Sequence, residues 1–158
     1  MLEANARGFF PYTPAINLLQ GLRVAVDMLN EEGLDAVFTR HHRAGAATRA
    51  AVRRWGFETQ CSDEGAHSPV LTAVRLPEGV SADGLRDTIL DRCNMSLGNG
   101  LGQLEDRVFR IGHLGEFNDT LLLGTIAAIE AAMDHAGVAH QAGGIGAAIN
   151  VLNGRAGT

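Results

Sequence analysis

The hydrophobic period of the chain changes at Gly56, and this change limits the fold more than any other feature. Before Gly56, apolar residues recur at the spacing of amphipathic helices. After it, short apolar runs are separated by polar and glycine-rich turns, a pattern typical of strands alternating with single helices. The expected order is helix, helix, strand, strand, helix, strand, strand, helix. This order predicts an α+β domain with a mainly antiparallel sheet, helices on one face, and a long helix leading into it.

Helix caps and glycine stops place the expected elements. The first dozen residues look irregular, and Thr13-Pro14 predicts an N-cap followed by proline at the first helical position. That helix should end at Gly33, and a second should run from about Leu34 to Trp55. The remaining expected elements are strands at 57–61, 70–76, 95–97 and 108–114, and helices at 81–92, 118–136 and 145–152.

Charge and composition exclude several classes of function. The net charge is −5 and no basic cluster is present, which argues against nucleic-acid binding. No apolar run is long enough for a membrane span, and the first residues lack the apolar core of a secretory signal, so we expect a cytoplasmic protein without membrane partners. The histidines and two cysteines lack the spacing of metal ligands, so we expect no metal site.

The chain contains no lysine: all 13 of its basic residues are arginine. A coding bias toward arginine would explain this composition, but the chemical consequence holds whatever its cause. A Schiff base needs a primary amine, and only the terminal amine of this chain could supply one. We therefore expect no catalytic residue for lysine-dependent chemistry within these residues.

Arg110 is a candidate binding residue because it lies in the apolar run from Val108 to Gly112. On a strand, Arg110 shares a face with Val108 and Gly112, opposite Phe109 and Ile111. An arginine among apolar neighbours needs an anionic partner, and the guanidinium matches a carboxylate in a bidentate fork. A carboxylate ligand is one interpretation. An ion pair within the chain, or a solvated arginine on an edge strand, is the other; the acids nearest in sequence are Glu105 and Asp106.

Three further features are weaker. Thr13, at an expected helix N-terminus, could bind an anion or only cap the helix. The glycines at 98, 100 and 102 do not form a dinucleotide fingerprint, because no strand–turn–helix unit surrounds them. Gly143-Gly144-Ile145-Gly146 lies too near the end of the sequence to support such a site. Both glycine clusters predict turns or a helix start.

Two segments together carry a family resemblance. They are Phe10-Pro11-Tyr12-Thr13-Pro14-Ala15 with Asn17-Leu18-Leu19 and Gly21-Leu22-Arg23, and Phe109-Arg110-Ile111-Gly112-His113-Leu114-Gly115-Glu116 with Asn118. In order, separation and context they resemble the class V pyridoxal-phosphate aminotransferases of the serine–glyoxylate and alanine–glyoxylate type. The Ala142-Gly143-Gly144 segment also fits the bacterial serine–glyoxylate branch. The likeness covers nearly the whole chain.

The resemblance implies roles for individual residues. The arginine that binds the substrate carboxylate falls on Arg110, and the threonine that reaches the cofactor phosphate of a neighbouring subunit falls on Thr13. Some members place a phosphate-binding tyrosine three residues before that threonine, where this chain has Phe10, which lacks a hydroxyl. Tyr12 could compensate as a second cofactor-binding residue.

The resemblance also implies a division of the chain. Residues 1–32 correspond to the end of a large domain and its linking helix, and residues 33–158 to the small C-terminal domain of a fold-type-I pyridoxal-phosphate transferase. The large domain, which bears the Schiff-base lysine, has no counterpart here. We expect a C-terminal part of a transaminase that moves an amino group from serine or alanine to glyoxylate and is inactive alone. A homodimer or a complementing N-terminal piece would be its partner.

Two other interpretations stay open at this point. The chain could be a non-catalytic α+β module that binds small acids or only dimerises, or it could be a remnant without function. The sequence does not identify the amino donor, and it does not distinguish a natural split protein from a truncated reading frame. Without a partner, the first long helix would expose its apolar face.

Overall fold

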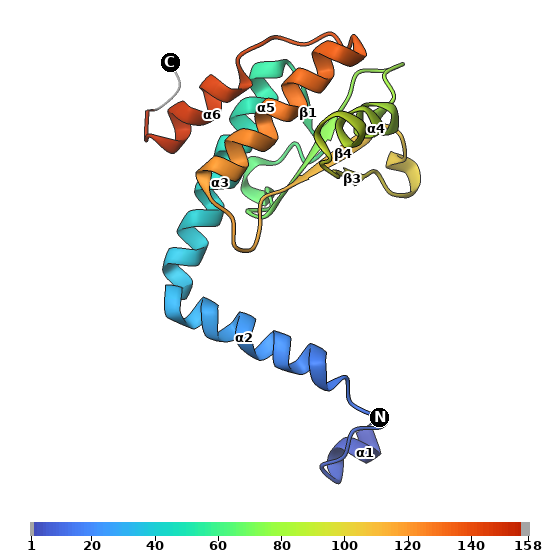
Figure 1. Cartoon of the computed structure of the whole chain (residues 1–158), viewed down its shortest axis with the longest axis vertical. Helices are drawn as coiled ribbons and strands as arrows, with labels where there is room; N and C mark the ends of the chain where they lie inside the picture. The colour runs from blue at the N-terminus through green and yellow to red at the C-terminus, as the bar shows by residue number, and fades with distance from the viewer. Residues whose placement is uncertain (1, 156–158) are drawn as a thin grey trace. The chain divides into compact units, whose positions relative to one another are not determined.

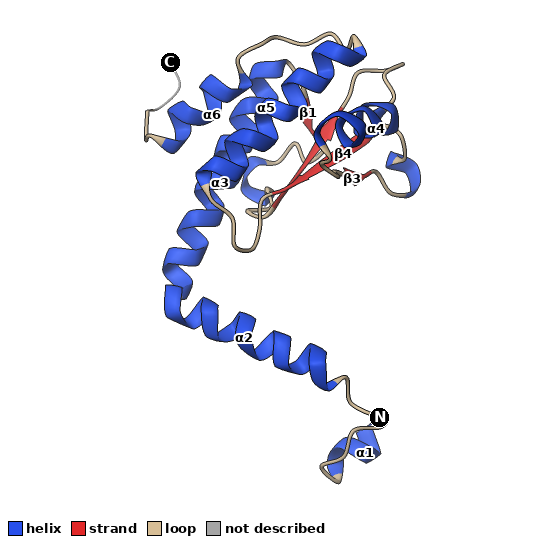
Figure 2. Cartoon of the chain, in the orientation of Figure 1, coloured by secondary structure: helices blue, strands red, loops and turns tan. Residues whose placement is uncertain are grey.

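The chain was analysed as a computed structural model, which describes residues 2–155 (Figure 1). Two compact units make up the chain, Met1–Val37 and Phe38–Thr158. Helices and strands alternate in the second unit, whereas the first is helical (Figure 2). No helix within residues 2–155 is both long and apolar enough to cross a membrane.

The first unit contains α1 (Leu2–Ala6) and α2 (Ile16–Glu32). The prediction of an irregular start was wrong. The run from Leu2 to Ala6 is rich in helix-forming residues and forms one short helix. The N-cap assigned to Thr13 was also wrong. The cap of α2 is Ala15, whose carbonyl accepts the Leu19 N–H, while the Pro14 carbonyl accepts the Ile16 N–H in a tight turn. Pro14 therefore lies before the helix.

No residue of α2 is buried. The helix ends as expected at Gly33, whose φ of 84° suits a glycine and whose N–H binds the Leu29 carbonyl. Large apolar side chains lie exposed along α2, and they are Ile16, Leu18, Leu19, Leu22, Val24, Val26, Met28 and Leu29. On ordinary protein surfaces exposed apolar residues are scattered singly, whereas here they follow one another along a single helix. Extended apolar surfaces of this kind mark contact sites.

The second unit begins within α3 (Leu34–Trp55), which has the predicted bounds and stops at Gly56 with a φ of 87°. Four antiparallel strands form one sheet in the order β1-β2-β4-β3. Their bounds are Glu58–Thr59 for β1, Leu71–Arg75 for β2, Gly98–Asn99 for β3 and Val108–Gly112 for β4. The helices are α4 (Ala82–Cys93), α5 (Asp119–Ala136) and α6 (Gly144–Leu152), with 3-10 turns at Glu64–Ala66 and Gly102–Leu104.

The third strand was predicted at 95–97, about three residues before the observed β3. The Leu97 carbonyl accepts a hydrogen bond from Arg86 Nε at 2.9 Å, and the Leu97 side chain is buried in the core. This segment is therefore tied to α4 instead of to a neighbouring strand. Pairing begins only at Gly98, which was expected to lie in a turn.

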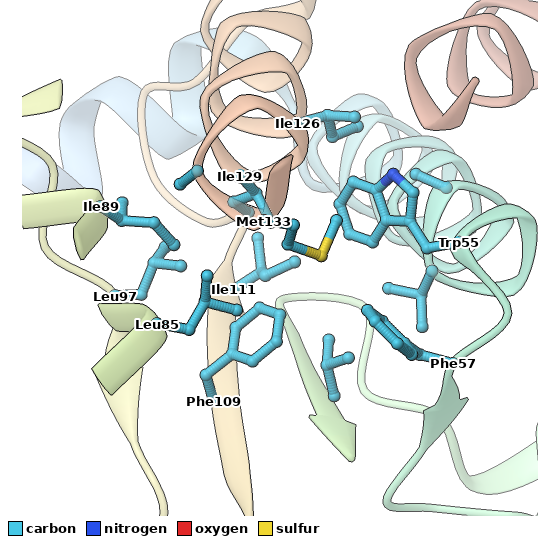
Figure 3. Close-up of a cluster of buried hydrophobic side chains, with 14 of the residues drawn as sticks. Trp55, Phe57, Leu85, Ile89, Leu97, Phe109, Ile111, Ile126, Ile129 and Met133 are labelled. Carbon is cyan, nitrogen blue, oxygen red and sulfur yellow. The ribbon is translucent and has the colours of Figure 1, made fainter. Parts of the chain in front are cut away.

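One core joins the helices to a single face of the sheet. Phe109 and Ile111 of β4 and Val74 of β2 lie in the same buried cluster as residues from α3, α4, α5 and α6. Figure 3 shows Phe109 and Ile111 pointing toward Met133 and Ile129 of α5. The α+β architecture with helices on one face, as predicted, therefore places Arg110, which lies between Phe109 and Ile111, on the face away from the helices.

Glu130 of α5 fastens the start of α6 to the end of α3. Its carboxylate accepts hydrogen bonds from the Gly143 and Gly144 N–H groups and from the Trp55 indole, each at 2.8 Å. A Cβ at Gly144 would collide with the Trp55 ring, so only glycine fits there. Burial raises the pKa of Glu130, but the three hydrogen bonds outweigh burial, and the pKa lies below its ordinary value.

We predict that Glu130→Ala lowers the free energy of unfolding by about 2–3 kcal/mol, because three donors lose a charged acceptor. The folded-state pKa is depressed, so the contribution of Glu130 is complete above the unfolded-state pKa and is lost as the pH falls through the folded-state value. Urea unfolding at several pH values measures both effects. Asp91→Ala, an exposed acid on α4, is the control and should change stability little. Equal effects of the two substitutions would contradict the role of Glu130.

We predict that the chain alone self-associates through α2, as expected for an exposed apolar helix. Replacing Leu18 and Leu22, which are 75% and 60% exposed, by glutamine should shift the sedimentation profile toward monomer. Replacing the polar Gln20 of the same helix by alanine is the control. A monomeric wild-type chain would contradict the prediction.

Candidate functional site

Arg110 lies in the middle of β4, between the two flanking strands β2 and β3. Its cross-strand partners are Ala73 on β2 and Gly98 on β3. Phe109 and Ile111 are buried in the core, whereas Arg110 is half-buried on the opposite face. The side-chain alternation predicted for this strand is thus confirmed.

The Arg110 side chain lies over β3. Its Nε donates to the Asn99 carbonyl at 2.8 Å, and its Nε and Cζ pass within 3.0 and 3.4 Å of the position that a Cβ of residue 98 would take. Neither terminal guanidinium nitrogen hydrogen-bonds to another residue within 2–155. One edge of the guanidinium is therefore held by the protein.

One alternative to a ligand-binding Arg110, an ion pair within the chain, is not formed among residues 2–155. Asp106 accepts hydrogen bonds from Ser81 Oγ at 2.6 Å and from the Asp83 N–H at 2.9 Å, and these bonds lower its pKa. Across residues 2–155, no acid forms an ion pair with Arg110, and this includes Glu105. Arg110 is also not on an edge strand, since β4 has a neighbour on each side. Its terminal nitrogens are thus available to solvent or to a ligand.

The glycines at 98, 100 and 102 shape the β3–β4 connection. Gly98 lies in β3 against the Arg110 side chain, and Gly100 is buried where a Cβ would collide with the Leu104 carbonyl. Gly102 has a φ of 56°, which suits a residue without a Cβ. The expectation of turn residues holds for Gly102 and was wrong for Gly98.

His113 follows β4 and is fully buried beside the sheet. Its Nε2 lies 2.9 Å from Thr72 Oγ1, and its Nδ1 has no hydrogen-bond partner within the described chain. Burial lowers the pKa of His113 to about 4, and the nearby Arg49 also lowers it. His113 is therefore neutral at neutral pH. Within residues 2–155 no group of three potential metal ligands comes together.

Thr13 and Tyr12 belong to the first unit, and Arg110 belongs to the second, so the structure defines the surroundings of each separately. Thr13 and Tyr12 are exposed in the segment before α2, and neither side chain hydrogen-bonds to another residue in the described part of the chain. Both hydroxyls are thus open to a ligand. Thr13 does not lie at the first turn of α2, so a phosphate bound there would be held by hydroxyl groups instead of by helix N–H groups.

Each of these residues, taken separately, has a group that a pyridoxal-phosphate enzyme could use. The hydroxyls of Thr13 and Tyr12 suit a phosphate, and the open guanidinium of Arg110 suits a substrate carboxylate. The amine that would anchor the cofactor is not present, since the sequence contains no lysine. Sequence reasoning proposed Arg110 as a candidate but missed the contacts of Gly98 and Asn99 with its side chain; the close-set glycines were the one available signal.

Comparison with known proteins finds similar aminotransferases. No protein-family model matches the chain. The chain is 42% identical over 149 residues to a serine–glyoxylate aminotransferase of Hyphomicrobium methylovorum, covering 94% of this chain and 37% of the relative. It is 40% identical to an L-aspartate–glyoxylate aminotransferase of Paracoccus denitrificans, covering 94% of this chain and 38% of the relative.

A solved structure shares the fold. Pyridoxamine–pyruvate aminotransferase of Mesorhizobium loti superposes with a TM-score of 0.86 at 34% identity, covering 93% of this chain and 38% of that chain. The chain thus spans well under half the length of the proteins that it matches. These three proteins are named for three different amino donors and for two acceptors, glyoxylate and pyruvate, so similarity alone does not select a substrate for this chain.

Proposed function

Because the chain belongs, by sequence and fold, to the class V pyridoxal-phosphate aminotransferases of the glyoxylate type, we propose that it supplies the substrate-binding part of such an enzyme. The complete enzyme would move an amino group from serine or alanine to glyoxylate. The open guanidinium of Arg110 is the observation that carries this proposal. Both the amino donor and the keto acceptor have a carboxylate, so one arginine would bind either in turn.

Arg110 would orient the substrate. Its terminal nitrogens would donate two parallel hydrogen bonds to the carboxylate, while its Nε stays bonded to the Asn99 carbonyl. Fixing the carboxylate at two points sets the direction of the bonds at Cα and contributes proximity and alignment. Arg110 would not exchange a proton, because a guanidinium remains charged throughout the working pH range.

Pyridoxal phosphate, when bound, supplies the electron sink and carries the amino group between substrates. Thr13 Oγ1 and the Tyr12 hydroxyl would hold its phosphate, and the phosphate would belong to the site of a neighbouring subunit. The lysine that anchors the cofactor and moves the Cα proton must lie outside these 158 residues, since none is present among them. The chain alone would therefore be inactive.

We assign residues 1–32 to the end of the large domain with its linking helix, and residues 33–158 to the small domain. A change of compact unit after Val37, close to this boundary, supports the assignment. The exposed apolar residues of α2 support a partner that covers them, either a second copy in a homodimer or a complementing N-terminal piece. Serine, alanine and glyoxylate would be the small-molecule partners.

The test supplies the missing part of the enzyme. The chain is co-expressed with the N-terminal part of the Hyphomicrobium methylovorum relative, ending where the similarity to this chain begins. We predict pyridoxal-phosphate-dependent transamination from serine or alanine to glyoxylate in the mixture and none in either piece alone. Arg110→Ala should lower kcat/KM by roughly 100-fold, because two charged hydrogen bonds to the substrate are lost. Arg53→Ala, a substitution on α3, is the matched control.

Two results would count against the proposal. An active Arg110→Ala mixture would remove the role of Arg110. A wild-type mixture that assembles but transfers no amino group would favour the non-catalytic small-acid-binding or dimerisation module. Borohydride reduction of the chain with pyridoxal phosphate, followed by mass spectrometry, provides a check without catalysis: any addition should lie at the terminal amine.

A further inference from the structure

The segment from Gly98 to Asn99 packs against the one side chain on which the proposed function rests. We propose that Gly98 is a positioning residue, and that Gly98 and the Asn99 carbonyl together form a cradle that sets the direction of the Arg110 guanidinium before a substrate arrives. This inference rests on the proposed function for its purpose, but its physical content can be tested without it.

The first part of the cradle is a gap. In the β3–β4 register Gly98 is the direct partner of Arg110, and side chains of paired residues lie side by side on one face of a sheet. A Cβ at residue 98 would lie 3.0 Å from Arg110 Nε and 3.1 Å from Arg110 Cβ. A Cβ at residue 98 would therefore crowd the Arg110 side chain, which would have to shift by a few tenths of an ångström away from β3.

The second part is an acceptor. The Asn99 carbonyl accepts the Nε–H of Arg110 at 2.8 Å, a length typical of charged hydrogen bonds. Because the acceptor is a backbone atom of the paired strand, its position is fixed by the sheet and does not depend on a side-chain rotamer. With Nε engaged, the two terminal nitrogens are the pair left to meet a carboxylate in a bidentate fork.

The strand carrying the cradle is itself held in place on both sides. Before it, the Leu97 carbonyl is bonded to Arg86 of α4. After it, the buried Gly100 packs against the Leu104 backbone so closely that a Cβ would collide with the Leu104 carbonyl. Gly98 and Gly100 thus both allow the backbone in and after β3 to pack closely against its neighbours.

An arginine fixed in advance binds its ligand more tightly, because the entropy of ordering a long side chain has already been lost on folding. Gly98→Ala should free the guanidinium from Asn99 and weaken carboxylate binding by roughly three- to tenfold, the cost of immobilising one flexible side chain. The same change should leave the fold intact, because the three atoms nearest to the new Cβ all belong to the Arg110 side chain and none is a backbone atom.

Nitrogen-15 relaxation of arginine side chains in the full 158-residue chain tests the cradle. In the wild type we expect an Nε–H order parameter for Arg110 near that of rigid backbone, about 0.85, and a value below about 0.6 for the exposed Arg53. Gly98→Ala should bring Arg110 down to the Arg53 level. Gly112→Ala is the matched control. Gly112 lies on the same strand and face as Arg110, and a Cβ there would meet only the Leu114 side chain, at an ordinary 3.4 Å.

A mobile Arg110 in the wild-type chain would overturn the proposal even if Gly98→Ala failed to fold. An Arg110 that stays ordered in a folded Gly98→Ala chain would overturn it equally. Titration with glyoxylate, read at the Arg110 Nε signal, separates the cradle from the proposed function. An ordered Arg110 that does not respond to glyoxylate supports the cradle and counts against carboxylate binding, whereas a response weakened roughly three- to tenfold in Gly98→Ala supports both.

Discussion

Burial of Phe109 and Ile111 against the helices decides the direction in which Arg110 points. Side chains alternate along β4, so holding these two residues in the core places Arg110 on the other face of the sheet. A slip of one residue would reverse the arrangement and bury the guanidinium without a partner, at a large cost in free energy. The packing that stabilises the domain therefore also places Arg110 on the face of the sheet away from the helices.

Much of this arrangement follows from the sequence, because its causes are local. The helices predicted from residues 81 and 118 do begin there, with Ser81 and Asn118 as their N-caps. The glycine stops at Gly33 and Gly56 also mark real helix ends. The failures come from single hydrogen bonds that the hydrophobic pattern does not reveal. The Leu97 carbonyl is bonded to Arg86 of the preceding helix instead of to a strand, and the Ile16 N–H is bonded to the Pro14 carbonyl in a turn that delays the start of α2 beyond Thr13.

Residues that act through their backbone were the hardest to find. Gly98 contributes the absence of a side chain, and Asn99 contributes its carbonyl, so neither has a chemical signature of the kind that marks Arg110. Glu130 is similar, since its role depends on Trp55 and on the start of α6 meeting at one carboxylate. The roles of Thr13 and Tyr12 toward a phosphate remain predictions, because they depend on parts outside the described chain.

The absence of lysine and the open guanidinium of Arg110 lead to one account, in which this chain orients a substrate whose chemistry is completed elsewhere. A crystal structure of the complemented enzyme with an amino acid bound tests that account most directly. It should show both carboxylate oxygens about 2.7–2.9 Å from the terminal nitrogens of Arg110, with Nε still bonded to the Asn99 carbonyl. A carboxylate bound by other residues, with Arg110 facing solvent, would contradict it.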